Sequence, residues 1–243
     1  SPARKVLFEK AGLSIQDTPG LGTDIYCREW HVDPDVEINE DCLYLNIWTP
    51  AKAETDKLPV FIWVHGGGMV AGSGCEVVCD GTGFASRKDV IVVTINYRLG
   101  FFGFFAHPEL TKEGNGTSGN YALYDIRKAC QWVKENIDKF GGDPERITVA
   151  GQSGGAAATG AIHASPLMKG IIQRVSIESG PIYWGFMQPE DRSVMEQRGV
   201  EFMKYINCAS INELRERDAW DLFDEYQNYE NMPSDSILEY IYL

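Results

Sequence analysis

The hydrophobic positions of this chain predict alternating strands and helices. Continuous apolar runs at residues 60–64 and 90–95 are typical of strands buried on both faces, whereas residues 43–48 alternate apolar and polar positions, as a half-buried strand does. A β-branched stretch at 147–151 and a short apolar stretch at 175–177 predict two more strands.

Helical periods separate these strands. From 119 to 140, apolar residues recur every three or four positions, and Gly141-Gly142 would end that helix. Small residues at 156–164 predict a second helix. Because helices that join successive strands make those strands parallel, this order predicts an α/β fold with a mostly parallel sheet and crossover helices.

The two ends of the chain have other patterns. Residues 1–40 show no clean period, and the C-terminal part is helical and acidic. We expect one domain over residues 1–243, in which residues 188–243 form a helical segment that packs on the sheet or begins a cap. Within that segment the pattern predicts helices near 195–205, 211–217 and 220–229.

The chain is acidic, with a formal net charge of −13 and a pI near 4.7. This charge argues against nucleic acid and anionic membranes as partners. No apolar run approaches the roughly 18 residues that a membrane span needs, so we expect a soluble protein, either cytoplasmic or secreted. The chain opens at Ser1-Pro2 without an initiating methionine, which indicates a fragment or a processed product. The sequence does not indicate an oligomeric state.

The six cysteines do not decide the redox compartment. Cys27 and Cys42 flank a polar stretch and could form a disulfide, although two separate thiols fit the sequence about as well. Cys75 and Cys79 have no second Cys/His pair nearby to complete a zinc site. We therefore predict no metal.

A Gly-x-Ser-x-Gly motif, Gly151 to Gly155, lies between a predicted strand and a predicted helix. This context is typical of a nucleophile elbow, in which a strained turn lifts the hydroxyl of Ser153 above the sheet. Gly151 and Gly155 would let the strand and the helix pass closely, because neither has a Cβ. A chance match in a glycine-rich loop is the alternative, and the flanking elements argue against it.

A second glycine-rich stretch, His65-Gly66-Gly67-Gly68, directly follows the predicted strand at 60–64. Ligands of open α/β sheets bind beyond the carboxyl ends of the strands. Backbone N–H groups of adjacent glycines can converge on a small oxygen and form an oxyanion hole. The alternative is a flexible loop.

A serine nucleophile needs a base, and the base needs an acid that orients it. Of the four histidines, His65 belongs to the glycine loop, and His31 and His107 lie in segments without a strand-end signal. His163 lies about 15 Å along the helix from Ser153, too far to accept its proton. In this architecture the acid and the histidine follow the serine, and no histidine follows His163, so we expect both to lie outside this chain.

Motifs between residues 40 and 180 carry a family resemblance. They are EDCLYLNIW at 40–48, VHGGG at 64–68 with Gly72-Ser73, NYRLG at 96–100 with FGF at 102–104, GNYALYD at 119–125, FGGDP at 140–144, GQSGG at 151–155 and Ser179-Gly180. Together, and in this order, they resemble the type-B carboxylesterase/lipase family, to which cholinesterases belong.

The resemblance implies an α/β-hydrolase fold, of which this chain would be the N-terminal half. It also implies hydrolysis of small-molecule carboxylic esters through an acyl-enzyme, without a cofactor. In such an enzyme Ser153 would be the nucleophile, and the N–H groups of Gly67, Gly68 and Gly154 would form the oxyanion hole.

The resemblance also implies two supporting features. Ser179 would match a buried serine that helps to hold the triad acid. Cys42 would match a cysteine that forms a disulfide in many secreted members, with Cys27 as its partner.

The chain departs from the family pattern at several positions. Gln152 and Gly154 replace the usual Glu and Ala around the serine; Gly154 keeps its N–H, whereas Gln152 removes a buried charge. Met69 stands where an aromatic residue is usual, which would widen the pocket. Family chains are much longer, and we expect the first hairpin of the family to be absent here.

Two other functions compete with a serine esterase. One is a non-catalytic binding or adhesion module on the same fold, and the other is a short pseudoenzyme with esterase ancestry. Binding modules of this group normally lose the nucleophile, so Ser153 with its elbow and the glycine loop favours the esterase.

Overall fold

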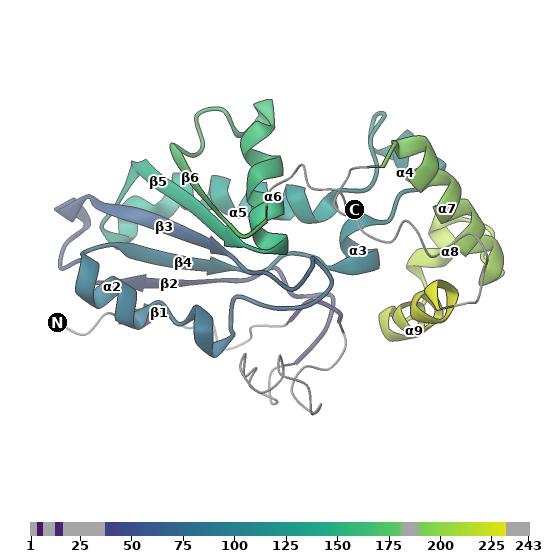
Figure 1. Ribbon diagram of the computed structural model, residues 1–243, viewed down its shortest axis with the longest axis horizontal. Helices are drawn as coiled ribbons and strands as arrows, with labels where there is room; N and C mark the ends of the chain where they lie inside the picture. The colour runs from purple at the N-terminus through teal and green to yellow at the C-terminus, as the bar shows by residue number, and fades with distance from the viewer. Residues whose placement is uncertain (1–3, 7–12, 17–36, 181–189, 232–243) are drawn as a thin grey trace.

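The computed structural model describes residues 4–6, 13–16, 37–180 and 190–231, and its centre is a six-stranded sheet (Figure 1). The strands, in spatial order, are β1 (Arg4–Val6), β2 (Leu45–Thr49), β4 (Ile91–Ile95), β3 (Leu58–Val64), β5 (Gly142–Gln152) and β6 (Arg174–Glu178). Strands β4, β3, β5 and β6 pair in parallel, whereas β1 and β2 are antiparallel to their neighbours. The predicted α/β fold with a mostly parallel sheet is confirmed.

Several elements differ from the sequence prediction. Strand β1 was not predicted; it pairs with the end of β2 and has only three residues, too few to show a period. Strand β5 begins at Gly142, which pairs with Leu58 across a register shift before regular pairing starts at Val60. The helix predicted from 119 to 140 is α5 (Tyr121–Asn136) followed by the 3-10 helix η3 (Ile137–Phe140).

Helices cover both faces of the sheet (Figure 1). Because side chains alternate along a strand, Val93 packs into a cluster with α5 and α6 (Gly154–Ala164), whereas its neighbour Val92 packs with α2 (Thr82–Lys88). The apolar stripe of α5 faces this main core, and Ile126, Cys130 and Val133 are fully buried. The three- and four-residue period that predicted α5 is therefore its buried face.

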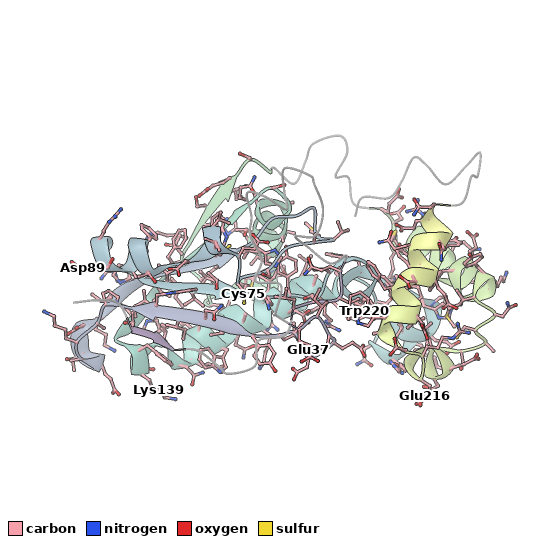
Figure 2. All side chains as sticks on the ribbon, turned by 90° about the horizontal axis from the view of Figure 1, so that it is seen from below. Glu37, Cys75, Asp89, Lys139, Glu216 and Trp220 are labelled. Carbon is pink, nitrogen blue, oxygen red and sulfur yellow. The ribbon has the colours of Figure 1, made fainter. Side chains whose placement is uncertain are left out.

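A separate helical part lies at one end of the molecule, where Figure 2 labels Trp220 and Glu216, opposite the end with Asp89 and Lys139. The expected helical segment, 188–243, contains three helices between residues 192 and 230, and its residues 188–189 and 232–243 lie outside the described ranges. Its core joins α3 to the later helices through Phe101, Phe202 and Leu222. The helices of this part are α3 (Gly100–Phe104), α4 (Pro108–Glu113), α7 (Arg192–Tyr205), α8 (Ile211–Arg215) and α9 (Ala219–Glu230).

Short 3-10 helices complete the described chain: η1 (Glu54–Asp56), η2 (Val77–Cys79) and η4 (Pro166–Met168). Within the described ranges, the helices are too short or too polar to span a bilayer.

Candidate active site

Ser153 lies at the turn between β5 and α6, with φ 55° and ψ −123°. A positive φ is uncommon for a residue with a Cβ and stores strain unless neighbouring contacts hold it. Here the Ser153 N–H donates to the carbonyl oxygen of Glu178 at 2.9 Å, and the Ser153 carbonyl oxygen accepts from the N–H of Ala156 at 3.0 Å. The predicted strained turn between strand and helix is confirmed.

Glycines allow other backbone segments to approach this turn. A Cβ on Gly151 would overlap the carbonyl oxygen of Gly155, and a Cβ on Gly155 would overlap that of Val64. A Cβ on Gly180 would overlap the carbonyl oxygen of Ser153. Side chains at these positions would force the strand, the helix and the segment after β6 apart, as the sequence predicted for Gly151 and Gly155.

The glycine loop that follows β3 lies directly against the serine turn. Gly67 and Gly68 have φ values of 94° and 62°, in the left-handed region that favours glycine. A Cβ on Gly154 would lie 3.0 Å from the backbone nitrogen of Gly68, and a Cβ on Gly66 would lie 3.4 Å from the Cβ of Ser153. The loop and the turn meet because β3 and β5 are adjacent parallel strands whose ends lie at one rim of the sheet.

His65 lies beneath this loop as a buried, neutral group. Its side chain is 1% exposed and stacks on Tyr97 with ring centroids 4.4 Å apart. Its Nδ1–H donates to the carbonyl oxygen of Gly66 at 2.9 Å, and burial lowers the pKa of the ring to about 4. Its other nitrogen, Nε2, is buried without a hydrogen-bond partner. The Tyr97 hydroxyl donates to the His65 carbonyl oxygen at 2.8 Å, which fixes the start of the loop.

The other histidines do not pair with the serine in the described structure. His107 caps α4 by accepting from the N–H of Glu109 at 3.2 Å, and His163 is exposed in the last turn of α6. His31 lies outside the described residues. Among the described residues, no hydrogen bond joins the Ser153 hydroxyl to a histidine.

Ser179 differs from its expected environment. We expected a buried serine, whereas the Ser179 side chain is exposed in this chain, with φ 57°; its place beside the triad acid stays a prediction. It follows β6, which is the edge strand of the described sheet, so no described strand covers it on the outer side.

Cys42 is buried, and burial raises the pKa of its thiol. Its proposed partner, Cys27, lies outside the described residues, so the disulfide stays a prediction. The described residues contain no group of three or more His, Cys, Asp or Glu side chains that could hold a metal ion.

Three polar residues around the glycine loop were not predicted from the sequence. Gln16 hydrogen-bonds to Gly72, Glu76 accepts from the N–H of Ser73, and Asn96 accepts from the N–H of Gly74. Asn96 lies in one of the family motifs, which was a usable signal. Gln16 and Glu76 had no such signal, because each is a single polar residue without a recognisable spacing.

Comparison with known proteins identifies the family. A family model described as "Carboxylesterase family" matches residues 16–240. The chain is 46% identical over 186 residues to fumonisin B1 esterase of Sphingopyxis macrogoltabida, covering 76% of this chain and 33% of that protein. It is 44% identical over 142 residues to para-nitrobenzyl esterase of Bacillus subtilis (strain 168), covering 58% of this chain and 28% of the relative.

Solved structures agree with the sequence match. A structure titled "PNB esterase" superposes with a TM-score of 0.78 at 30% identity, and the match covers 96% of this chain and 45% of that one. The chain thus has the α/β-hydrolase fold and spans about a third of the length of the curated relatives that it matches. On the match of the family model and these relatives, the chain belongs to the carboxylesterase family.

Proposed function

We propose that this chain carries the nucleophile and the oxyanion hole of a serine hydrolase that cleaves small carboxylic esters through an acyl-enzyme at Ser153. The observation that carries the proposal is the contact between Gly68 and Gly154 beside the strained turn of Ser153. To bind an oxyanion, backbone N–H groups from the ends of two strands must point at one oxygen atom, and this contact supports such an arrangement. The names of the relatives, esterases of fumonisin B1 and of para-nitrobenzyl compounds, support an ester as substrate.

In the proposed reaction, the Ser153 hydroxyl oxygen attacks the ester carbonyl carbon while a base takes its proton. The carbonyl oxygen becomes an oxyanion that accepts hydrogen bonds from the N–H groups of Gly67, Gly68 and Gly154. Loss of one such donor typically costs about 3 kcal/mol of transition-state stabilisation. Collapse of this intermediate releases the alcohol and leaves an acyl-enzyme, which water cleaves to the carboxylate and free Ser153.

The base is proposed to come from outside these residues. The buried His65 has its pKa lowered to about 4 and its Nδ1 bonded to Gly66, and His163 is exposed on α6. We assign the acid and the histidine of the triad to a further part of the protein, with Ser179 beside the acid. In the same arrangement residues 1–243 form one partial domain, and residues 188–243 pack on it or begin a cap.

A catalytically incomplete protein on the same fold is the second candidate. The observation that favours it is that no described histidine is hydrogen-bonded to Ser153. The two candidates differ in turnover, because a nucleophile without a base reacts slowly even where the oxyanion hole is intact.

The test compares ester hydrolysis by residues 1–243 with hydrolysis by the longest chain that the gene encodes. Para-nitrophenyl butyrate reports turnover, and mass spectrometry reports covalent labelling by an organophosphate. We expect the longest chain to turn over and to be labelled at Ser153, and Ser153→Ala to abolish both. The matched control is Ser86→Ala, an exposed serine on α2, which should leave both unchanged. Turnover that survives Ser153→Ala would overturn the proposal, and a longest chain without turnover would favour the incomplete protein.

A further inference from the structure

A short buried segment, residues 13–16, runs beneath the glycine loop. Its side chains are at most 4% exposed, and the segment is anchored before it reaches the loop. The Leu13 N–H donates to the Glu37 carbonyl oxygen at 2.8 Å, and the Leu13 carbonyl oxygen accepts from Asn39 at 2.9 Å. The Ser14 hydroxyl donates to the carbonyl oxygen of Tyr97 at 2.6 Å. These hydrogen bonds, to residues 37–39 and to Tyr97, fix the segment that carries Gln16.

The Gln16 amide binds both backbone polar groups of Gly72. Its Oε1 accepts from the Gly72 N–H at 2.7 Å, and its Nε2 donates to the Gly72 carbonyl oxygen at 3.1 Å. The second Nε2 proton goes to the Ser14 carbonyl oxygen at 3.2 Å. An amide that is 1% exposed thus has its donors used within the protein, and it pairs with Gly72 as a neighbouring strand would.

The next two backbone N–H groups are also held by side chains. Oε1 of Glu76 accepts from Ser73 at 3.0 Å, and Oδ1 of Asn96 accepts from Gly74 at 2.8 Å. Gly72, Ser73 and Gly74 are therefore each bound by a different side chain.

The side chains of Gln16, Glu76 and Asn96 together form a clamp on residues 72–74. This clamp is linked directly to the glycines beside Ser153. Ala71, the residue before Gly72, donates to the carbonyl oxygen of Gly67 at 3.0 Å. A shift of Gly72 would move Ala71, and through that hydrogen bond it would move Gly67 and Gly68 relative to Gly154.

We propose that Gln16 and Glu76 are positioning residues: by fixing Gly72 and Ser73, they hold the N–H groups of Gly67 and Gly68 beside Gly154. The role in catalysis rests on the proposed function above. The clamp itself does not, since it is a property of the hydrogen bonds around Gly72 and Ser73.

The first experiment measures the clamp without using activity. Hydrogen–deuterium exchange of residues 1–243, followed by mass spectrometry, is compared for wild type and Gln16→Met, which keeps the length of the side chain and loses its amide. Peptides that cover residues 66–74 should exchange about tenfold faster, because two hydrogen bonds to Gly72 are lost, while α5 peptides stay unchanged. Gln197→Met is the matched control, because Gln197 is an exposed glutamine on α7 whose amide donates to Glu201 on the same helix at 2.9 Å.

A second variant keeps this test decisive if Gln16→Met loosens the whole domain. Gln16→Glu has nearly the same shape and keeps an acceptor for the Gly72 N–H. Even a protonated carboxyl group has one proton where the amide has two, so at least one of the bonds to the carbonyl oxygens of Gly72 and Ser14 is lost. This variant should also accelerate exchange at residues 66–74. Unchanged exchange of the loop in both variants would overturn the clamp.

The second experiment measures turnover per active site in the longest encoded chain, with sites counted by organophosphate titration. Gln16→Met should lower kcat and kcat/KM together by about tenfold or more, with KM nearly unchanged, because an oxyanion hole acts in the transition state. If Gln16 were merely structural, its substitution would lower the number of active sites and leave the turnover per site unchanged. Faster loop exchange with unchanged turnover per site would overturn the positioning role. A wild type without turnover would refute the proposed function, and the exchange data would still decide the clamp.

Discussion

Gly155, in the first turn of α6, lies directly against the carbonyl oxygen of Val64 at the end of β3, so that a Cβ on Gly155 would overlap that oxygen. The atoms that such a Cβ would meet belong to the backbone of Val64 and His65, which cannot rotate away as a side chain can. Neither β3 nor α6 can move without disturbing the serine turn. We expect Gly155→Ala to destabilise the protein by about 3 kcal/mol, as overpacking against fixed neighbours does. Urea denaturation of residues 1–243 measures this change.

Gly83→Ala is the matched control, because a Cβ on Gly83 would meet no atom within 4 Å on the exposed face of α2. Alanine is the better helix former, so this variant should gain up to about 0.5 kcal/mol. Equal effects of the two substitutions would mean that the close approach of α6 to β3 is not a constraint.

Glu76 should make stability fall as the pH rises. Burial raises the pKa of its carboxyl group from 4.5 to about 7, although the N–H of Ser73 favours the charged form. A carboxyl group whose folded pKa is raised contributes its full stability below pH 4.5 and loses it as the pH rises to about 7. The size of this shift corresponds to a loss of about 3 kcal/mol.

Comparison with Glu76→Gln isolates this effect. The side chain of this variant is neutral at every pH and keeps an oxygen for the Ser73 N–H. In urea denaturation, its free energy of unfolding should therefore rise relative to that of wild type between pH 5 and pH 8. His65, whose folded pKa is lowered to about 4 by burial, contributes equally to both proteins and cancels in the comparison. Burial raises the pKa of Cys79 to about 12, above this range. Parallel stability curves for the two proteins would show that Glu76 ionises normally.

Burial of Cys42 predicts a slowly reacting thiol. Cys42 is 2% exposed, and burial raises the pKa of its thiol, so little of the reactive thiolate is present at neutral pH. We expect iodoacetamide to alkylate Cys42 at least about tenfold more slowly in the folded chain than after unfolding in urea. Peptide mapping of the alkylated chain, prepared without reductant, measures the two rates, and equal rates would contradict the prediction.

The same mapping on wild type tests the pairing of Cys27 with Cys42. A Cys27–Cys42 peptide would establish that disulfide, whereas a Cys42 that reacts only after unfolding would indicate a buried free thiol.

Local patterns predicted most of the fold and part of the site. The apolar run at 60–64 and the motif around Ser153 each specify their own conformation, so β3, β5 and α6 could be placed from the sequence. Contacts between distant segments had no local signal. Gln16 acts on a residue 56 positions away, and β1 exists only through its pairing with β2. The exposure of Ser179 likewise follows from the place of β6 at the sheet edge.

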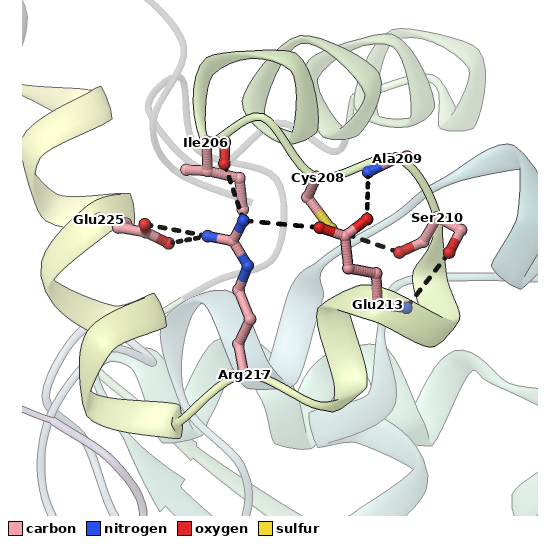
Figure 3. Close-up of polar contacts among 7 residues, drawn as sticks. All are labelled: Ile206, Cys208, Ala209, Ser210, Glu213, Arg217 and Glu225. Carbon is pink, nitrogen blue, oxygen red and sulfur yellow. Dashed lines mark hydrogen bonds and ion pairs between the residues drawn. The ribbon is translucent and has the colours of Figure 1, made fainter.

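One guanidinium group joins two helices of the helical part (Figure 3). Nη1 of Arg217 donates to both carboxylate oxygens of Glu225 on α9, at 3.0 and 2.9 Å, and Nη2 donates to the carbonyl oxygen of Ile206, just after α7, at 2.8 Å. Arg217→Met keeps the apolar stem and leaves that carbonyl oxygen without its donor. We expect a loss of about 1–2 kcal/mol in urea denaturation, because an unsatisfied acceptor adds to the loss of the ion pair.

Arg215→Met provides the comparison within the same segment. Arg215 also forms a short ion pair, with Glu113 at 2.6 Å, but both side chains are 51% exposed. Water replaces such a pair at little cost, so this variant should lose less than about 0.5 kcal/mol, and salt should reduce that loss further. If the two arginine variants lose the same free energy of unfolding, then the bond to Ile206 contributes nothing, and the apolar cluster around Phe202 alone holds α9 against α7.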